Sequence, residues 1–259
     1  MRILLTNDDG IYAPGIAALR AEMSALGTVT VVAPDAERSA AGHSITLDRP
    51  LRVREVYVGD TFVGFGVDGS PADCVKLGIK QILQAPPDLV MSGINLGSNV
   101  GINVLYSGTV AAALEGSILG VTSIAVSLAA SKKPDFALAA RIASSVTRQI
   151  LANSFPRASL FNVNVPSCPL GQMRGPSVCR QSVISYEDGF DMRTDPRGGR
   201  YFWMTGELNR GLVPPDSDAA LLHEKHVTVT PLQYDLTDVH LLNICQQWNM
   251  ELPKDRTVP

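Results

Sequence analysis

The stretch RILLTNDDG (residues 2–10) decides the fold, because an apolar, strand-like run ends there on two adjacent carboxylates and a glycine. In an open parallel sheet, ligands bind in the crevice beyond the carboxyl ends of the strands. Asp8 and Asp9 would repel each other there, and a hard divalent cation such as Mg²⁺ is the counter-charge that carboxylate oxygens favour. Gly10 permits the turn that would bring both side chains to one ion. The alternative is a pair of solvated carboxylates or caps for the helix that follows.

The same alternation of strand-like and helical segments continues through the first 166 residues. Runs rich in β-branched residues predict strands, and apolar residues at a spacing of three and four predict helices. This order is typical of an α/β protein with a doubly wound, mostly parallel, Rossmann-like sheet, and we expect residues 1–166 to form that core. The predicted strands are 2–6, 28–33, 89–91, 123–128 and 160–165, and the predicted helices are 14–26, 73–83, 109–119 and 137–151.

The character of the sequence changes after residue 166. Proline, glycine and charged residues become frequent, and helical spacing is absent until 236–247. Short alternating segments at 199–205 and 226–231 indicate the strands of hairpins. We expect residues 167–259 to form an extended β-hairpin and a carboxy-terminal segment that packs on, or is swapped with, a neighbouring subunit.

Composition narrows the range of partners. The chain has 259 residues and a net charge of −3, which disfavours duplex nucleic acid as a partner and leaves a single nucleotide possible. Its four cysteines form no CxxC pair, so a structural zinc site is not expected. No apolar run is long enough to span a bilayer, and residue 1 leads directly into the first strand rather than into a leader. We therefore expect a cytoplasmic protein with no membrane partner.

Two further polar segments follow predicted strands and so emerge at the same edge of the sheet. In APDAERSAAGHS (residues 33–44), Ser39 is a neutral oxygen for a metal, and His43 is a proton donor, a phosphate ligand or a structural loop histidine. In MSGINLGSNVG (residues 91–101), glycines let the backbone approach an anion, and the Asn95 amide is a hard-metal ligand. The second segment matches neither GxxxxGK[ST] nor GxGxxG.

A fourth segment, YSGTVAAALEG (residues 106–116), places Ser107, Gly108 and Thr109 directly before an alanine-rich helix. The free N–H groups and the positive dipole end of such a helix favour a phosphate. Ser107 or Thr109 can also be an ordinary helix cap, which is compatible with that role.

Together these four segments, with VTPLQYDLT (residues 229–237), resemble the SurE (survival protein E) family of metal-dependent 5′-nucleotidases, in the family's order and over almost the whole chain. The resemblance implies hydrolysis of nucleoside 5′-monophosphates with one Mg²⁺ or Mn²⁺ per subunit, in a homodimer or homotetramer. It implies catalytic roles for Asp8, Asp9 and Asn95. The implied metal ligands are Asp8, Asp9, Ser39 and Asn95, and the implied phosphate contacts are Asn95, Ser107, Gly108 and Thr109, with Ser39 and His43 beside them.

Other functions stay open at this point. A non-catalytic nucleotide-binding regulator would keep the glycine-rich loop but would not need Asp8 and Asp9 together. A phosphatase acting mainly on 3′-nucleotides or short polyphosphate is a second alternative. The missing GxGxxG motif argues against a nicotinamide-dependent dehydrogenase. Adjacent aspartates also differ from the spacing of haloacid dehalogenase phosphatases, in which one residue separates them. Direct attack by water is preferred to an aspartyl-phosphate, because both carboxylates are expected to bind the ion.

Overall fold

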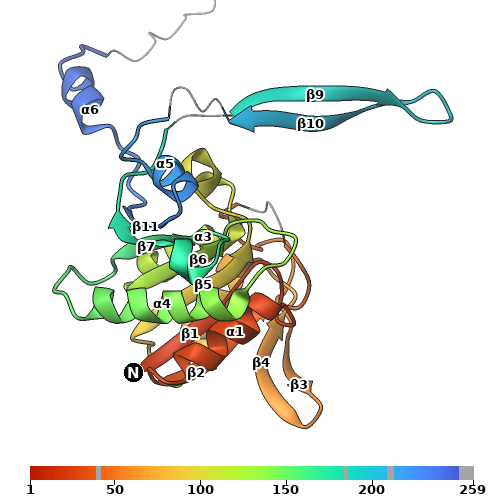
Figure 1. The fold of residues 1–259 in the computed structure, drawn as a ribbon, viewed down its shortest axis with the longest axis vertical. Helices are drawn as coiled ribbons and strands as arrows, with labels where there is room; N and C mark the ends of the chain where they lie inside the picture. Colours follow the sequence, from red (N-terminus) through yellow and green to blue (C-terminus); the bar gives the residue numbers. More distant parts are fainter. Residues whose placement is uncertain (39–41, 184–185, 209–212, 251–259) are drawn as a thin grey trace, which may run out of the picture.

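A computed structural model describes residues 1–38, 42–183, 186–208 and 213–250, and in them the chain forms a nine-stranded sheet with helices on both faces (Figure 1). The strand order is β3-β4-β2-β1-β5-β6-β7-β11-β8. Six neighbouring strands, from β4 to β7, are parallel, so the predicted mostly parallel sheet is confirmed. The strands are β1 (Arg2–Thr6), β2 (Thr28–Pro34), β3 (Val53–Val58), β4 (Thr61–Val67), β5 (Leu89–Leu96), β6 (Ser123–Leu128), β7 (Leu160–Val165), β8 (Arg174–Val178) and β11 (His226–Leu232).

The centre of the sheet contains its switch point, where the order of strands reverses. β1 pairs with β2 on one side, where Leu5 lies opposite Val31, and with β5 on the other, where Leu5 lies opposite Met91. The chain therefore builds outward from β1 in two directions and leaves a crevice between the carboxyl ends of β1 and β5. The polar segments that follow these two strands meet at this crevice.

Helices cover both faces of the sheet. α1 and α4 contact each other on one face, and α2 and α3 contact each other on the other face. Leu5 packs in the cluster beneath α1 and α4, whereas its neighbour Leu4 packs in the cluster beneath α2 and α3. Burying each leucine contributes about 1.5–3 kcal/mol, so β1 is stabilised from both sides. The helices are α1 (Pro14–Met23), α2 (Pro71–Leu77), α3 (Gly108–Ile118) and α4 (Phe136–Leu151).

Local sequence accounts for where these helices begin. Ser70 and Asp73 form a capping box at the start of α2, because each side chain accepts a hydrogen bond from the other residue's backbone N–H. Asp135 accepts a hydrogen bond from the Leu138 N–H at the start of α4. The sequence therefore defines the starts of α2 and α4 by ordinary capping.

Several boundaries differ from the sequence prediction. α1 ends at Met23 rather than at residue 26, because the chain turns at Ser24, which caps the last carbonyls. β5 continues to Leu96 instead of stopping at residue 91, since it pairs with β6 again after an irregularity. α2 ends at Leu77 and passes into a π-helical turn at Gly78–Ile82. The hairpin β3–β4 and the short helix α5 (Asp218–His223) were not predicted.

The segment after residue 166 contributes both to the sheet and to an arm. β11 pairs antiparallel with β7, and β8 pairs with β11, so both belong to the main sheet. β9 (Tyr186–Thr194) and β10 (Arg200–Leu208) form a separate antiparallel hairpin, called the arm here, that extends away from the body of the protein (Figure 1). The strand predicted at 199–205 overlaps β10, and the one predicted at 226–231 is β11, which lies in the main sheet and not in a hairpin. α6 (Val239–Cys245) falls within the helix predicted at 236–247.

The arm and α6 expose large apolar side chains to solvent, including Phe202 and Trp203 on the arm and Leu241 on α6. Patches of this kind on a single chain indicate an interaction surface. No described helix is both long and apolar enough to cross a bilayer.

Candidate functional site

A pocket of about 220 Å³ lies at the switch point. Asn7 forms the turn after β1, because its side chain donates to the Gly10 carbonyl at 2.9 Å and accepts from the Gly10 N–H at 3.2 Å. Gly10 has a φ of +97°, which glycine adopts without strain. The predicted turn after Asp8 and Asp9 is therefore present. The pocket is lined by Asp8, Asn95, Asn99, Asn103, Tyr106, Ser107 and Gly108.

The two aspartates hold negative charge that the surrounding protein only partly compensates. Burial raises the pKa of Asp8, although a hydrogen bond from the Thr109 hydroxyl to Oδ1, at 2.5 Å, opposes that effect. Burial, followed by the charges of Asp8 and Glu37, raises the pKa of Asp9 to about 6, while a backbone hydrogen bond from Leu96 lowers it. A cation bound here would favour the charged form of both carboxylates and so oppose the effect of burial on their pKa values.

The start of α3 packs directly against Asp8. A Cβ atom on Gly108 would lie 2.8 Å from the Asp8 Cβ and 2.9 Å from its Oδ2. Only glycine therefore allows this approach, which brings the free N–H groups of the first helical turn to the acidic pocket. Ser107 is the N-cap, since its hydroxyl accepts a hydrogen bond from the Val110 N–H at 3.1 Å.

The Thr109 side chain packs behind Asp8, and the predicted phosphate contact of Thr109 stays a prediction. This side chain is fully buried, and its hydroxyl donates to Asp8 instead of lining the pocket. Asn95, by contrast, lines the pocket, and its amide nitrogen donates to the Gly97 carbonyl at 2.8 Å. The structure therefore brings Asp8, Asn95, Ser107 and Gly108 together around one cavity, with Asp9 beside Asp8 and Thr109 behind it.

Ser39 falls in residues 39–41, outside the described part of the chain. Its neighbour Arg38 donates its backbone N–H to the Asp8 carbonyl at 2.8 Å, which ties the loop after β2 to the acidic turn. The predicted role of Ser39 as a metal ligand stays a prediction.

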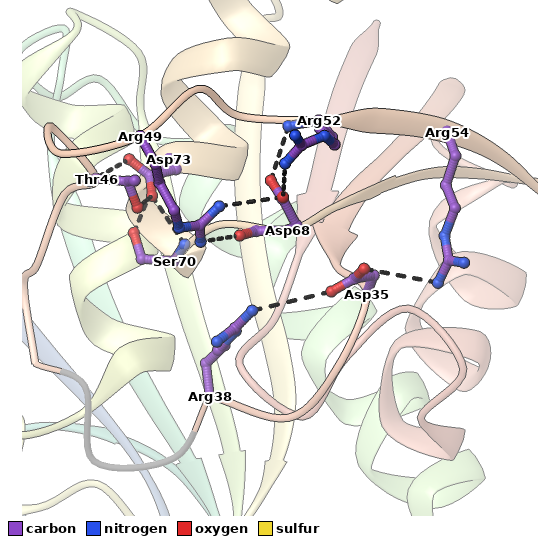
Figure 2. A network of polar contacts seen from close by, with 9 residues as sticks. All are labelled: Asp35, Arg38, Thr46, Arg49, Arg52, Arg54, Asp68, Ser70 and Asp73. Carbon is purple, nitrogen blue, oxygen red and sulfur yellow. Dashed lines mark hydrogen bonds and ion pairs between the residues drawn. The ribbon is translucent and has the colours of Figure 1, made fainter.

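Ion pairs hold this loop against the β3–β4 hairpin (Figure 2). Arg38 and Arg54 point toward Asp35 from opposite sides, with N–O separations of 4.0 and 3.7 Å. Arg49 and Arg52 both pair with Asp68. Exposed pairs contribute little each, so we interpret the network as fixing loop geometry more than total stability.

His43 does not line the acidic pocket. Its Nε2 lies 2.9 Å from Oε2 of Glu115, a buried residue of α3, and Lys76 reaches the other oxygen of that carboxylate at 2.5 Å. Burial acts to raise the pKa of Glu115, but hydrogen bonds and charges from His43 and Lys76 outweigh it and lower that pKa. His43 instead borders a second, mostly apolar cavity of about 390 Å³. Of the three roles considered for His43, namely proton donor, phosphate ligand and structural loop histidine, this geometry favours the last.

Three pocket residues were not singled out from the sequence: Asn99 and Tyr106, which lie inside the motifs, and Asn103, which lies between two of them. Asn99 and Asn103 continue the glycine and asparagine pattern that pointed to Asn95, so the composition of the segment could have indicated them. Tyr106 is largely exposed beside Ser107, and nothing in its local pattern distinguishes it from a surface tyrosine.

The donor set fits a hard divalent cation. Among the described residues, no three His, Cys, Asp or Glu side chains gather into a metal cluster, so a metal here would depend on two carboxylates and neutral oxygens. Mg²⁺ commonly binds in this way, through one or two carboxylates, with water and substrate oxygens completing its shell. Burial raises the pKa of both Asp8 and Asp9, and a divalent cation would stabilise their ionised forms.

An open, doubly wound sheet with an acidic, oxygen-lined pocket beside a helix N-terminus defines a class of α/β proteins suited to binding a cation together with an anion. Comparison identifies the group within this class. The sequence model of the family "Survival protein SurE" matches residues 3–188. The chain belongs to the SurE family.

Individual relatives agree with this assignment over nearly the full length. The chain is 47% identical over 253 residues to 5′-nucleotidase SurE of Carboxydothermus hydrogenoformans, covering 96% of each protein. It is 48% identical over 238 residues to 5′-nucleotidase SurE of Syntrophus aciditrophicus, covering 92% of this chain and 90% of that one. The crystal structure of the SurE protein from Aquifex aeolicus is similar with a TM-score of 0.84 and 38% identity, covering 95% and 98% of the two chains.

Proposed function

We propose that this protein is a divalent-metal-dependent phosphatase that hydrolyses nucleoside 5′-monophosphates to nucleoside and phosphate. Membership of a family whose curated relatives are named 5′-nucleotidases supports the reaction. The observation that carries the proposal is the contact of Gly108 with Asp8, because it joins an anion-binding helix start to an acidic pair in one pocket.

Each residue around the pocket has a distinct task in this proposal. Asp8, Asp9 and Asn95, together with Ser39, would hold one Mg²⁺ or Mn²⁺ per subunit. A bound divalent cation supplies Lewis-acid stabilisation of the phosphoryl group and lowers the pKa of a coordinated water. Thr109 keeps the Asp8 carboxylate in one orientation through its hydrogen bond.

The start of α3 would bind the phosphate. The N–H groups of Gly108 and Thr109 and the hydroxyl of Ser107 lie at the positive end of the helix dipole, where phosphate oxygens are favoured. Phosphoryl transfer depends mainly on positioning and electrostatics, so few dedicated side chains are required.

The size of the pocket bears on what it encloses. Its volume of about 220 Å³ is below the ~300–1,000 Å³ of sites that enclose a whole drug-sized ligand. We therefore expect the phosphate to enter the pocket and the nucleoside to remain at its mouth. This arrangement predicts discrimination by phosphate more than by base.

The test is phosphate release from 5′-AMP, 5′-GMP, 3′-AMP and tripolyphosphate, with Mg²⁺ or Mn²⁺ and with a chelator. We expect turnover of the 5′-nucleotides that the chelator abolishes and added metal restores. Binding of nucleotide without phosphate release would favour the non-catalytic regulator, and preferential release from 3′-AMP or tripolyphosphate would replace the proposed substrate. A captured acyl-phosphate on Asp8 or Asp9 would refute direct attack by water.

We also propose that the protein is cytoplasmic and self-associates as a homodimer or homotetramer through the arm and the carboxy-terminal segment. The exposed apolar groups of β10 and α6 support self-association. All four cysteines are free, which supports a reducing compartment. Light scattering of the full chain tests the assembly, and a monomer at micromolar concentration would contradict it.

A further inference from the structure

Asp218 is a buried carboxylate that none of the site motifs includes. It is fully inaccessible to solvent at the start of α5. Three backbone N–H groups donate to it: Gly101 to Oδ2 at 3.0 Å, Ser182 to Oδ1 at 2.9 Å and Ala219 to Oδ1 at 2.7 Å. Both oxygens are thus occupied by amide donors from three separate segments.

One of these donors belongs to the loop that lines the pocket. Gly101 lies between Asn99 and Asn103, two residues of the pocket lining, and its φ of +58° is left-handed. Its carbonyl accepts a second hydrogen bond, from Nε2 of Gln181 at 2.8 Å. The N–H and the carbonyl of Gly101 are therefore both bound by residues distant in sequence.

The segments that bind Gly101 are the two ends of the arm. Residues 179–182 lead toward β9, and residues 214–218 follow β10. They are joined to each other, because the Asp218 N–H donates to the Arg180 carbonyl at 2.9 Å and Arg180 bridges to Ser217. The base of the arm is thus a closed unit that contacts the pocket loop at Gly101.

The sheet holds the same loop two residues earlier. The Asn99 N–H donates to Oδ1 of Asn164 at 2.8 Å, and its carbonyl accepts from Nδ2 of Asn162 at 2.7 Å. Its side chain donates to the Ser127 hydroxyl at 2.8 Å. The sheet therefore positions Asn99, and the base of the arm binds the same loop two residues later, at Gly101.

We propose that Asp218 and Gln181 are positioning residues of the phosphatase site. By binding both polar groups of Gly101, they orient the chain that carries Asn103, Tyr106 and Ser107 to the start of α3. The base of the arm and the pocket then form one cooperative unit, so that a disturbance at the base reaches the phosphate contacts. The kinetic part of this inference rests on the proposed function, whereas its structural part does not.

The test compares two substitutions in the full chain. Asp218→Asn keeps the shape but replaces one accepting oxygen by an NH₂ group, which faces a backbone N–H in either orientation of the amide. Gln181→Met keeps the approximate volume and removes only the donor to the Gly101 carbonyl. The matched control is Asp216→Asn, which breaks the exposed ion pair with Arg180 at the same base without touching Gly101.

Two measurements separate positioning from general stability. Hydrogen exchange over residues 97–107 is expected to speed up at least tenfold in both test variants and to stay unchanged in the control. We expect KM for 5′-AMP to rise, and kcat/KM to fall about 10–100-fold, because small misplacements of binding groups have large kinetic effects. A purely structural role would lower the active fraction, and hence kcat, with KM unchanged.

The outcomes are distinct. Wild-type exchange at 97–107 in Gln181→Met would overturn the inference, even if Asp218→Asn did not fold. Faster exchange with unchanged KM would also overturn the positioning role. If the wild-type protein releases no phosphate from any nucleotide, the proposed function is refuted. Faster exchange at 97–107 in the two variants would then still support the link between the arm and the loop.

Discussion

Replacing Gly108 by alanine is the sharpest test of the site, because the structure shows which atoms the added methyl group would contact. It would lie 2.8 Å from the Asp8 Cβ and 2.9 Å from Oδ2. Carbon atoms in favourable contact are about 3.5–4.0 Å apart, so either Asp8 or the start of α3 must move by about 1 Å. Both are buried and both line the pocket, so the displacement changes the site itself.

We expect this substitution to affect activity more than stability. Overpacking of a buried contact costs about 1–3 kcal/mol, and the better helix propensity of alanine offsets part of that cost. A displacement of about 1 Å between catalytic groups lowers turnover about 100-fold. Gly108→Ala should therefore remain folded while losing about 99% of its kcat/KM for 5′-AMP.

The assays are phosphate release from 5′-AMP with saturating Mn²⁺ and urea denaturation followed by circular dichroism. Gly171→Ala is the matched control, because a Cβ atom there meets nothing within 4 Å. We expect the control to retain wild-type activity and stability. Wild-type turnover in Gly108→Ala would refute the assignment of this helix–aspartate contact to the active site.

Four further predictions concern charge and metal. Asp9→Asn should abolish turnover yet stabilise the metal-free protein, because the Asp9 pKa of about 6 lies above its ordinary 3.8 and the contribution of Asp9 to wild-type stability therefore falls as pH rises from about 4 to 6. In denaturation with chelator, the variant should be ~1–2 kcal/mol more stable than the wild type above pH 6. Equal stabilities at pH 7.5 would contradict this prediction. Mg²⁺ at 100 times its Kd should add ~2.7 kcal/mol to the unfolding free energy of the wild type and nothing to Asp9→Asn, as thermal shifts can check. Thr109→Val removes the hydrogen bond that orients Asp8, so it should raise the Mn²⁺ concentration for half-maximal activity more than the KM for nucleotide. A larger rise in KM than in the Mn²⁺ requirement would instead indicate that the Thr109 hydroxyl binds the phosphate. Glu115→Gln should lower stability at pH 7 by about 1–3 kcal/mol, because it weakens the pairing with His43 and Lys76. This difference should fade as the pH falls below about 4, where the unfolded wild-type carboxyl is protonated. An unchanged urea midpoint would show that the pairing contributes nothing.

Local patterns in the sequence were sufficient for the architecture. The apolar run before Asp8 alternates between two buried faces, and Leu4 and Leu5 do pack in different clusters. The exit from that strand, with Asn7 and Gly10 closing a turn, is also a local property. For these reasons the mostly parallel sheet and a polar site at the end of its first strand could be predicted, and the family motifs led to the same pocket.

The elements that the sequence did not predict also have a physical explanation. β3 is mostly exposed and lies at the edge of the sheet, so its sequence lacks the clear alternation of a half-buried strand. α5 is a helix of only six residues that begins at the buried Asp218 and has no periodic apolar face long enough to recognise. Such elements are stabilised by contacts outside the window in which a sequence pattern is read.

By itself, the sequence determined the alternation of strands and helices in the core, the turn that presents Asp8 and Asp9, and the chemical kinds of side chain at the sheet's edge. Only the tertiary structure decided which of those side chains face the pocket. Thr109 binds Asp8 from 101 residues away, His43 pairs with Glu115 across 72 residues, and Asp218 reaches Gly101 across 117. Strand and helix periodicities arise between neighbours in the chain, whereas these contacts arise from the packing of distant segments, which leaves no period in the sequence.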